Sequence, residues 1–270
     1  MTSLREQVDE LLWYHTIELP DGVVTPGWFD LRPTVAALPW PDVRGKRCLD
    51  VGTYDGFLAF ELERRGAAEV VAVDINDHAR WDWPPDVRAT GGANLAELAG
   101  PQRGAGFRLA AEAMGSKVSL QSTSVYELDP ATHGMFDVVV CGSLMLHLRD
   151  PLRALEAIRS VCGEAFLSTE EIDLGLSLRN RKQPVARING VGSLCQWWIP
   201  NRTGHLRMVR SAGFDIAKVG PMYANHFGGA HPPQTGWRET ARAQLQRRVL
   251  GSSGVPHSSV LATPGAWVPA

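Results

Sequence analysis

An apolar segment that runs into a glycine-bearing turn constrains the fold of this chain more than any other feature. Residues 48–57 read Cys-Leu-Asp-Val-Gly-Thr-Tyr-Asp-Gly-Phe, and a helical pattern follows them. A second apolar segment, residues 69–74, ends on Asp74. This order predicts a βαβ unit that binds a nucleoside, because an acid after the second strand accepts hydrogen bonds from ribose hydroxyls.

The residues of the turn discriminate between nucleotide ligands. A dinucleotide fold carries G-x-G-x-x-G, with a pyrophosphate at the helix start. This chain instead has Asp50, Gly52 and Gly56. A carboxylate before the first glycine would repel a pyrophosphate but suits an ammonium group. The pattern resembles motif I of the class I S-adenosylmethionine (SAM) methyltransferases; the alternative is a bare glycine-rich turn in another Rossmann-like protein.

The resemblance implies SAM as the cofactor and assigns a contact to each part of it. The turn is expected to hold the amino acid end, and the acid after the second strand is expected to hold the ribose. Adenine contacts arise after the third strand in such proteins, and the fourth strand ends beside the sulfur. The expected cofactor-binding residues are therefore Asp50, Gly52, Thr53, Gly56, Asp74, Ile75, Ser124, Val125 and Cys141.

Alternating strand and helix patterns predict a doubly wound, mostly parallel α/β sheet with a Rossmann-like methyltransferase fold and an N-terminal helical lid extension. Strands are expected at 47–51, 69–74, 117–122, 136–141, 164–169 and 214–219. Helices are expected within 2–14 and at about 56–66, 104–114, 151–161 and 202–212. The expected divisions are a lid segment at 1–40, the SAM-binding core at 41–222, and a C-terminal extension and tail at 223–270.

Two further stretches lie outside this alternation. Residues 77–103 are irregular and rich in Trp, Pro and Gly, and we expect them to cap the cofactor cleft. Residues 251–270 are rich in Gly, Ser and Pro without periodicity, and we expect them to form the tail.

Bulk properties limit the partners of the chain. Its 270 residues carry a net charge of −2 and no block of Lys or Arg, which argues against a nucleic acid substrate. Its four cysteines form no C-x-x-C pair, so neither zinc nor a redox pair is predicted. The polar N-terminus and the lack of a long apolar run predict a cytoplasmic protein without a membrane segment.

The order of the later motifs narrows the resemblance. Residues 136–151 resemble the fourth-strand region of these methyltransferases, 196–201 read Gln-Trp-Trp-Ile-Pro-Asn before a helix, and 13–22 read Trp-x-His-x-Ile-x-Leu-Pro-Asp-Gly. Over residues 10–220 this order resembles the bacterial tRNA wobble-uridine carboxymethyltransferase family and its small-molecule relatives. The tRNA enzyme has a tyrosine at the position of Leu146 that helps to recognise a carboxylated SAM. Leucine cannot hydrogen-bond a carboxylate, so ordinary SAM is expected.

Methyl transfer to oxygen needs a residue that takes up the acceptor proton. His147 follows the fourth strand where it opens into the cleft, which makes it the first candidate for the general base; Glu170 could orient its imidazole. His15 is the rival base. The alternatives are a structural role for His147 beneath the helix, and a solvated or helix-capping carboxylate at Glu170.

The expected acceptor-binding residues combine hydrogen-bonding and aromatic groups. They are His15, Trp28, Glu171, Arg181 and Trp198. Core packing is the alternative for the tryptophan pair near residue 198, and a solvated loop is the alternative for the arginines near residue 181. No set of acids forms an evident oxygen cage, so no metal is predicted, although magnesium, which some sugar O-methyltransferases use, stays open.

These observations predict a SAM-dependent O-methyltransferase that acts on a hydroxyl of a small polar acceptor, in first place a sugar. A methylated mannoside in polysaccharide biosynthesis is one such acceptor. The alternatives are a tRNA wobble-uridine (carboxy)methyltransferase, a natural-product tailoring methyltransferase, and a SAM-binding regulator that has lost catalysis. The pattern does not predict an oligomeric state.

Overall fold

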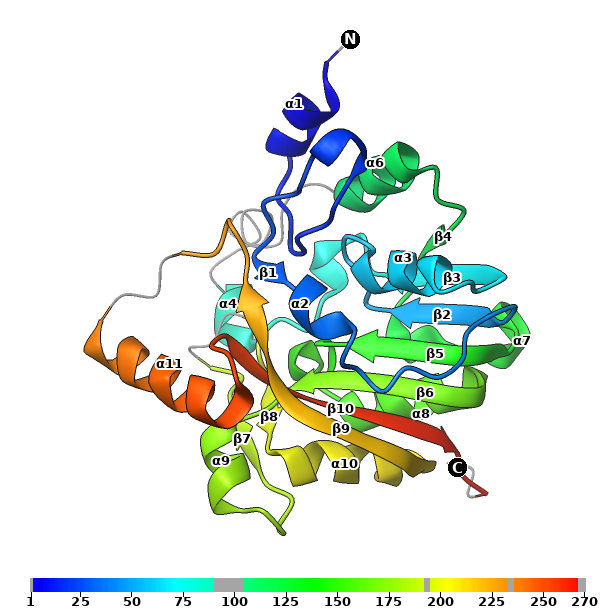
Figure 1. Ribbon diagram of the computed structural model, residues 1–270. Coiled ribbons are helices and arrows are strands. Elements are labelled where there is room, and N and C mark those ends of the chain that lie inside the picture. Colours follow the sequence, from blue (N-terminus) through cyan, green and yellow to red (C-terminus); the bar gives the residue numbers. More distant parts are fainter. Residues whose placement is uncertain (1, 90–103, 192–194, 233–235, 267–270) are drawn as a thin grey trace.

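Within residues 2–89, 104–191, 195–232 and 236–266, which the computed structural model describes, eight strands form the main sheet in the order β1-β9-β10-β6-β5-β2-β3-β4 (Figure 1). Neighbours among β4, β3, β2, β5 and β6 pair in parallel, whereas β10 is antiparallel to both of its neighbours. The strands are β1 (Phe29–Asp30), β2 (Arg47–Val51), β3 (Glu69–Asp74), β4 (Ser119–Ser122), β5 (Phe136–Gly142), β6 (Cys162–Glu171), β9 (Phe214–Phe227) and β10 (Val255–Pro264). A separate pair contains β7 (Ala186–Ile188) and β8 (Trp198–Pro200).

Helices cover both faces of this sheet, as Figure 1 shows. The α-helices are α1 (Leu4–Asp9), α2 (Arg32–Val35), α3 (Phe57–Arg64), α4 (Pro85–Ala89), α6 (Ala105–Met114), α7 (Pro130–His133), α8 (Pro151–Val161), α9 (Leu174–Arg179), α10 (Arg202–Ser211) and α11 (Trp237–Leu250). Short 3₁₀ helices are η1 (Pro20–Gly22), η2 (His78–Arg80), η3 (Val125–Glu127) and η4 (Met145–His147). The predicted doubly wound α/β fold is therefore confirmed.

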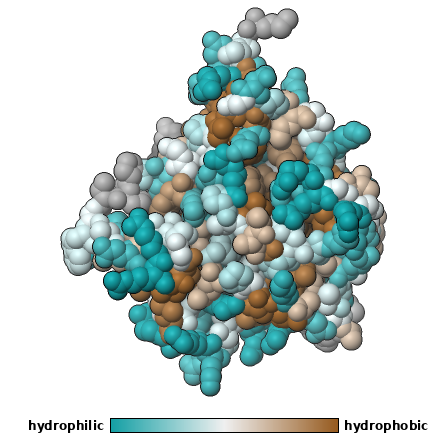
Figure 2. Space-filling model, viewed as in Figure 1, coloured by the Kyte–Doolittle hydropathy of each residue, from teal (hydrophilic) through white to brown (hydrophobic). Residues whose placement is uncertain are grey.

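Two hydrophobic cores follow from the alternation of side chains along each strand. On one face the core contains Cys48, Val70, Ala72, Val138 and Val140 together with side chains of α3, α6 and the N-terminal segment. On the other face it contains Leu49, Val51, Val71, Val139 and Cys141 together with side chains of α8 and α10. Both faces are buried, which explains why these strands are nearly continuous apolar runs in the sequence. On the outside, hydrophilic residues cover most of the face in Figure 2.

The N-terminal segment packs on the α3 face, and its helix is shorter than expected. The helix predicted within 2–14 ends at Asp9, and Leu12 is 52% exposed. Trp13 is buried instead, where its indole N–H donates to the carbonyl of Val8 at 3.0 Å. Beyond it the backbone N–H of Thr16 donates to the carbonyl of Phe29, so the chain folds back along itself.

The C-terminal residues expected to form a tail belong to the sheet. Residues 255–264 form β10, which lies between β6 and β9, and Val260 within it is fully buried. The expectation failed because the strand contains His257, Ser258 and Ser259, which broke the apolar pattern. Hydrogen bonds to other buried side chains satisfy His257 and Ser258. Residues 90–103 of the expected cap and 267–270 of the expected tail lie outside the described residues.

A pair of matched valines tests the burial of β10. Val260 and Val219 face each other in the β10–β9 register, yet Val219 is 40% exposed. We expect Val260→Ala to lower the free energy of unfolding by roughly 1–3 kcal/mol, because it leaves a cavity in the core. Val219→Ala should change it by less than about 0.5 kcal/mol. Urea denaturation measures both; equal losses would contradict the central position of β10.

Candidate functional site

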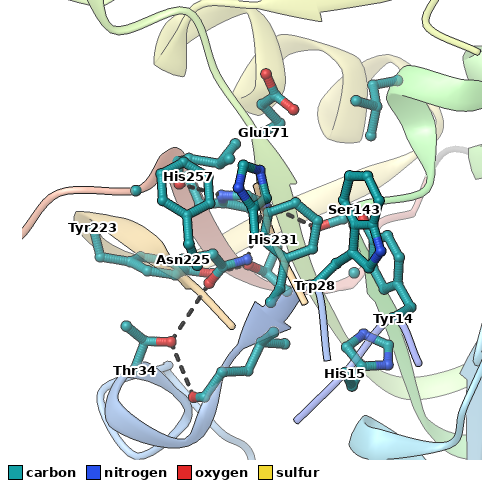
Figure 3. Close-up of a pocket in the computed structure, with 18 of the residues that line it drawn as sticks. Tyr14, His15, Trp28, Thr34, Ser143, Glu171, Tyr223, Asn225, His231 and His257 are labelled. Atoms are coloured by element: carbon teal, nitrogen blue, oxygen red, sulfur yellow. Dashed lines mark hydrogen bonds between the residues drawn. The ribbon is translucent and has the colours of Figure 1, made fainter. Parts of the chain in front are cut away.

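Two cavities meet at the carboxyl ends of the parallel strands. The larger has a volume of about 820 Å³ and the smaller about 210 Å³. Their common wall comes from the N-terminal segment, the turn after β2, the turn after β5 and the segment before β8. The residues that line both cavities are Tyr14, His15, Gly52, Gly142, Ser143, His147 and Cys195. Figure 3 shows several of these side chains facing the interior of the larger cavity.

Asp74 lies at the end of β3 and lines the smaller cavity. Its carboxylate accepts the backbone N–H groups of Tyr54 and Ile75, each at 2.7 Å. Burial raises the pKa of Asp74 to about 6, although these two N–H groups oppose the rise. Each carboxylate oxygen has a second lone pair, so Asp74 can also accept a hydrogen bond from a ribose hydroxyl.

The turn after β2 places its residues unevenly. Gly52 lines both cavities with φ at 76°, and a Cβ there would lie 3.0 Å from a methyl of Leu144. Gly56 lines neither cavity. Its φ is 93°, and a Cβ there would lie 2.5 Å from the ring of Phe60 and 2.7 Å from that of Phe107. Gly56 therefore permits the close packing of α3 and α6 side chains at this turn, and its cofactor contact stays a prediction.

The acid of the turn has the environment that an ammonium group requires. Asp50 is 1% exposed, and its Oδ2 is buried without a hydrogen-bond partner among the described residues. Burial raises the pKa of Asp50 to about 7, while the Thr53 hydroxyl opposes the rise. Asp50 and Thr53 line the larger cavity beside Gly52. A buried carboxylate oxygen without a donor fits the amino group of a bound amino acid moiety.

The predicted adenine contacts lie in the smaller cavity. Ile75, Ser124 and Val125 line it, and the Ser124 hydroxyl accepts the backbone N–H of Tyr126 at 3.3 Å. Trp81 and Trp83 also line it, with ring centroids 5.3 Å apart. This arrangement offers flat apolar surfaces for a base.

Cys141 does not contact either cavity. Its side chain is fully buried in the core that faces α8, and its thiol lies 3.9 Å from a Glu170 oxygen. The strand alternation turns Cys141 inward, so the next two residues, Gly142 and Ser143, reach the cavities in its place. The structure thus places Cys141 outside both cavities, and its cofactor contact stays a prediction.

His147 ends η4 and lines both cavities. Its Nδ1 lies 2.7 Å from the carbonyl oxygen of Cys195, and a carbonyl only accepts, so Nδ1 carries a proton. In the neutral ring Nε2 is then the nitrogen that accepts a proton. Burial by itself lowers the pKa of His147, but the hydrogen bond and charge of the Cys195 side chain outweigh burial and raise it to about 9.

Glu170 is a structural anchor rather than a partner of the imidazole. It is 2% exposed and lines neither of the two large cavities. Its carboxylate accepts the backbone N–H groups of Met145 at 3.1 Å and Leu144 at 3.4 Å. Burial raises its pKa to about 8. The expected catalytic contact is corrected, because Glu170 holds the turn that carries His147 and touches neither cavity.

Glu171 and His15 both reach the larger cavity. Glu171 follows Glu170 at the end of β6, so it faces the opposite way, and burial raises its pKa. His15 lines both cavities, and its Nδ1 lies 3.9 Å from Asp55 Oδ2, too far for a hydrogen bond. Burial lowers the pKa of His15 to about 3, so its imidazole is neutral. The Nδ1 of His15 is buried without a hydrogen-bond partner among the described residues, so no neighbouring group fixes its tautomer as the Cys195 carbonyl fixes that of His147.

The remaining expected acceptor residues divide into one that reaches the larger cavity and two that do not. Trp28 lines it, with its ring 5.5 Å from that of His231. Arg181 is exposed and lines neither large cavity. The indole N–H of Trp198 donates to the carbonyl of Arg149 at 3.1 Å, which fixes the ring outside the two cavities. The structure thus places Arg181 and Trp198 away from both cavities, and their acceptor contacts stay predictions.

Sequence patterns missed the polar wall that β9 and β10 contribute. Tyr223, Asn225 and His257 line the larger cavity, and Ser143 faces them from the turn after β5 (Figure 3). Their only signal was a run of polar residues in segments that were expected to be an extension and a tail. These side chains reach the cavity only because β10 pairs with β6 and β9, and no local sequence pattern predicts that pairing.

The described residues form neither a metal-binding cluster nor a membrane-spanning helix. No group of three or more His, Cys, Asp or Glu within the described residues is arranged to hold a metal ion. None of the described helices combines the length and apolar character that a bilayer crossing requires.

Comparison with known proteins places the chain in a family. A ubiquinone biosynthesis O-methyltransferase of Hahella chejuensis is 30% identical over 149 residues, which cover 54% of this chain and 50% of that protein. A tRNA U34 carboxymethyltransferase of Campylobacter hominis is 28% identical over 159 residues, which cover 58% of this chain and 47% of that protein. The chain thus spans about half the length of these curated relatives.

A solved structure supports the fold. An S-adenosylmethionine-dependent methyltransferase from Mesorhizobium loti superposes with a TM-score of 0.51 at 15% identity, covering 86% of this chain and 97% of that one. At this identity the likeness concerns the fold alone. The family model described as a methyltransferase domain matches residues 28–219, which is most of the chain. The chain therefore belongs to this methyltransferase-domain family, among the class I proteins whose methyl donor is S-adenosylmethionine.

Proposed function

We propose that the protein is a SAM-dependent O-methyltransferase that acts on a hydroxyl of a small polar acceptor, in first place a sugar. The observation that carries this proposal is the common wall of two unequal cavities, with His147 and Ser143 in it. The smaller cavity suits the nucleoside of the donor, and the larger cavity suits an acceptor. An acceptor hydroxyl at the wall would lie next to groups that can take up its proton.

The donor side follows from residues already described. Asp74 would hold the ribose hydroxyls, and the unpartnered oxygen of Asp50 would hold the amino group. When bound, SAM supplies an electrophilic methyl group on a sulfonium. The N-terminal segment contributes Tyr14 and His15 to the common wall, where it would cover the bound donor and exclude water from the sulfonium.

The acceptor side combines polar and aromatic groups. Thr34, Tyr223, Asn225 and Glu171 offer hydrogen-bonding atoms, and Trp28 offers a flat ring (Figure 3). Sugars present hydroxyls around the ring and apolar C–H faces, so this mixture favours them. A methylated mannoside of polysaccharide biosynthesis is one candidate, and the volume of about 820 Å³ admits more than a single ring.

Two other acceptors are an aromatic natural-product hydroxyl and a tRNA wobble uridine. The O-methylation named for the ubiquinone relatives supports an oxygen acceptor and keeps an aromatic natural-product hydroxyl as the second candidate. Methylation of a tRNA wobble uridine is disfavoured, because the net charge is −2 and Leu146 is buried where a carboxylated SAM would need a donor.

A labelled-donor screen tests the function directly. Purified protein with methyl-labelled SAM is offered methyl α-mannoside, a mannose oligosaccharide, 3,4-dihydroxybenzoate and bulk tRNA. We expect label on a sugar hydroxyl, with the position read by mass spectrometry and NMR. Label on the catechol alone would select the second candidate, and label on tRNA or on nitrogen would reject the proposal.

His147 is the proposed general base. Because Nδ1 donates to the Cys195 carbonyl, Nε2 is the accepting nitrogen of the neutral ring. The pKa of about 9 means that this base is neutral only at high pH. Part of the activity should therefore rise with pH as His147 loses its proton.

The pH profile checks this role. We expect kcat to rise through the pKa of His147, and His147→Ala to lower kcat at pH 9.5 by about 10², with SAM affinity near wild type. Cys195→Ser removes the sulfur group whose hydrogen bond and charge raise the pKa of His147, so the rise should move to lower pH. A rise that stays in place in Cys195→Ser, or survives in His147→Ala, would contradict the assignment.

Asp74 provides a test of the donor side that needs no acceptor. Asp74→Ala removes the carboxylate that would pair with two ribose hydroxyls, so we expect binding of S-adenosylhomocysteine to weaken by roughly 1.5–3 kcal/mol. Calorimetry measures the affinity. Asp42→Ala is the control, because Asp42 forms an exposed pair with Arg44 and lines neither large cavity. Equal affinities for both variants would reject the assignment.

A further inference from the structure

Ser143 has an unusual backbone at the junction of the two cavities. It follows β5 with φ at 52°, in the left-handed region that few residues other than glycine adopt. Its N–H donates to the carbonyl of Thr169 at 2.8 Å, so the strained turn is held in place. A serine rather than a glycine at such a position indicates that its side chain is needed there.

The hydroxyl of Ser143 faces an imidazole whose protonation the structure determines. Ser143 Oγ lies 2.8 Å from His257 Nε2, and His257 Nδ1 lies 2.8 Å from the carbonyl oxygen of Val255. Because a carbonyl oxygen only accepts hydrogen bonds, Nδ1 carries the ring proton. Nε2 is therefore the nitrogen that accepts the hydrogen bond of the Ser143 hydroxyl. The amide nitrogen of Asn225 lies 3.2 Å from the same Nε2 and supports this orientation (Figure 3).

A second buried serine–histidine pair shows what a purely structural pair looks like in this fold. His205 Nε2 lies 2.9 Å from Ser168 Oγ, and its Nδ1 lies 2.6 Å from Ser258 Oγ. Both ring nitrogens thus bind hydroxyls, and neither Ser168 nor His205 lines one of the two large cavities. Ser143 and His257 differ on this point, because Ser143 lines both cavities and His257 lines the larger.

We propose that Ser143 and His257 form a proton relay for the acceptor hydroxyl, working where His147 is still protonated. As the acceptor O–CH₃ bond forms and the donor S–CH₃ bond breaks, the acceptor proton moves to Ser143 Oγ. The proton of Ser143 moves in the same event to His257 Nε2. The positive charge of the sulfonium thereby passes to the imidazolium of His257, and no other reactant is needed. This inference rests on the proposed function.

The surroundings of His257 fit a transient charge. Burial lowers its pKa to about 4, so it waits in the neutral form at pH 7. A weak base suffices, because a hydroxyl oxygen that gains a methyl group becomes strongly acidic. Three ionisable groups lie around His257. Glu171 is its register partner on β6, and the ring centroid of Tyr223 on β9 lies 5.7 Å from that of His257. The third is His205 of α10. The carboxylate of Glu171 would stabilise the imidazolium.

The first test separates the two proton routes on the sugar that the labelled screen returns. In wild type we expect a plateau of kcat between pH 6 and 8 and a further rise toward pH 9. Ser143→Ala and His257→Gln should each lower kcat on the plateau by about 10² and keep the rise toward pH 9. His147→Ala should keep the plateau and lose the rise. Ser168→Ala, which alters the structural pair, is the control and should keep both features.

The second test needs neither donor nor acceptor. In the cofactor-free protein with ¹⁵N-labelled histidine, we expect His257 to show the tautomer protonated at Nδ1 from pH 6 to 8, with an Nε2 shift that changes in Ser143→Ala. The opposite tautomer, or an unchanged plateau in both Ser143→Ala and His257→Gln, would overturn the relay alone. A wild-type protein that methylates no hydroxyl at any pH would overturn the proposed function and the relay with it.

Discussion

Buried or half-buried carboxylates that each accept two backbone N–H groups connect the segments of the cleft. Three of them lie close to the carboxyl ends of the parallel strands, and each fixes the main chain of a different segment of the cleft. The pairs are Asp55 with Tyr14 and His15, Asp74 with Tyr54 and Ile75, and Glu170 with Leu144 and Met145. A carboxylate is costly to bury, and two charge-assisted hydrogen bonds offset much of that cost.

Two of these carboxylates join segments of the cleft that are far apart in the sequence. Asp55 belongs to the turn after β2, yet it binds the N-terminal segment, so the covering segment and the cofactor turn are joined at one side chain. Glu170 belongs to β6 and accepts backbone N–H groups of the turn after β5, so a side chain of β6 fixes the turn that carries His147. Burial raises the pKa of Asp55 to about 7, of Asp74 to about 6 and of Glu170 to about 8, because it disfavours the charged form of a carboxyl group.

The sequence predicts the parts of the cleft whose residues lie close together in the chain. The turn from Asp50 to Gly56 and the acid at Asp74 lie within one βαβ unit, so their spacing alone predicts the fold and a place for SAM. The sequence predicts less where a residue type has several uses. Glu170 and Trp198 carry suitable groups, yet one binds backbone N–H groups inside the fold and the other binds a carbonyl outside the cavities. His257 was missed because its strand pairs with residues far away in the chain.

This difference has a physical origin in how the two halves of the cleft are assembled. The donor half is formed by consecutive elements, so its geometry follows from short-range constraints that the pattern of residues records. The acceptor wall joins the N-terminal segment, the turn after β5 and the hairpin of β9 and β10, and each contributes single side chains such as Tyr14, Ser143 and Asn225. Asn225 lines the larger cavity alone, so a change there alters that cavity without touching the smaller one, whereas Tyr14 and Ser143 line both. Chains that share the residues of the donor half can therefore methylate different acceptors, because the side chains of the wall determine which acceptor binds.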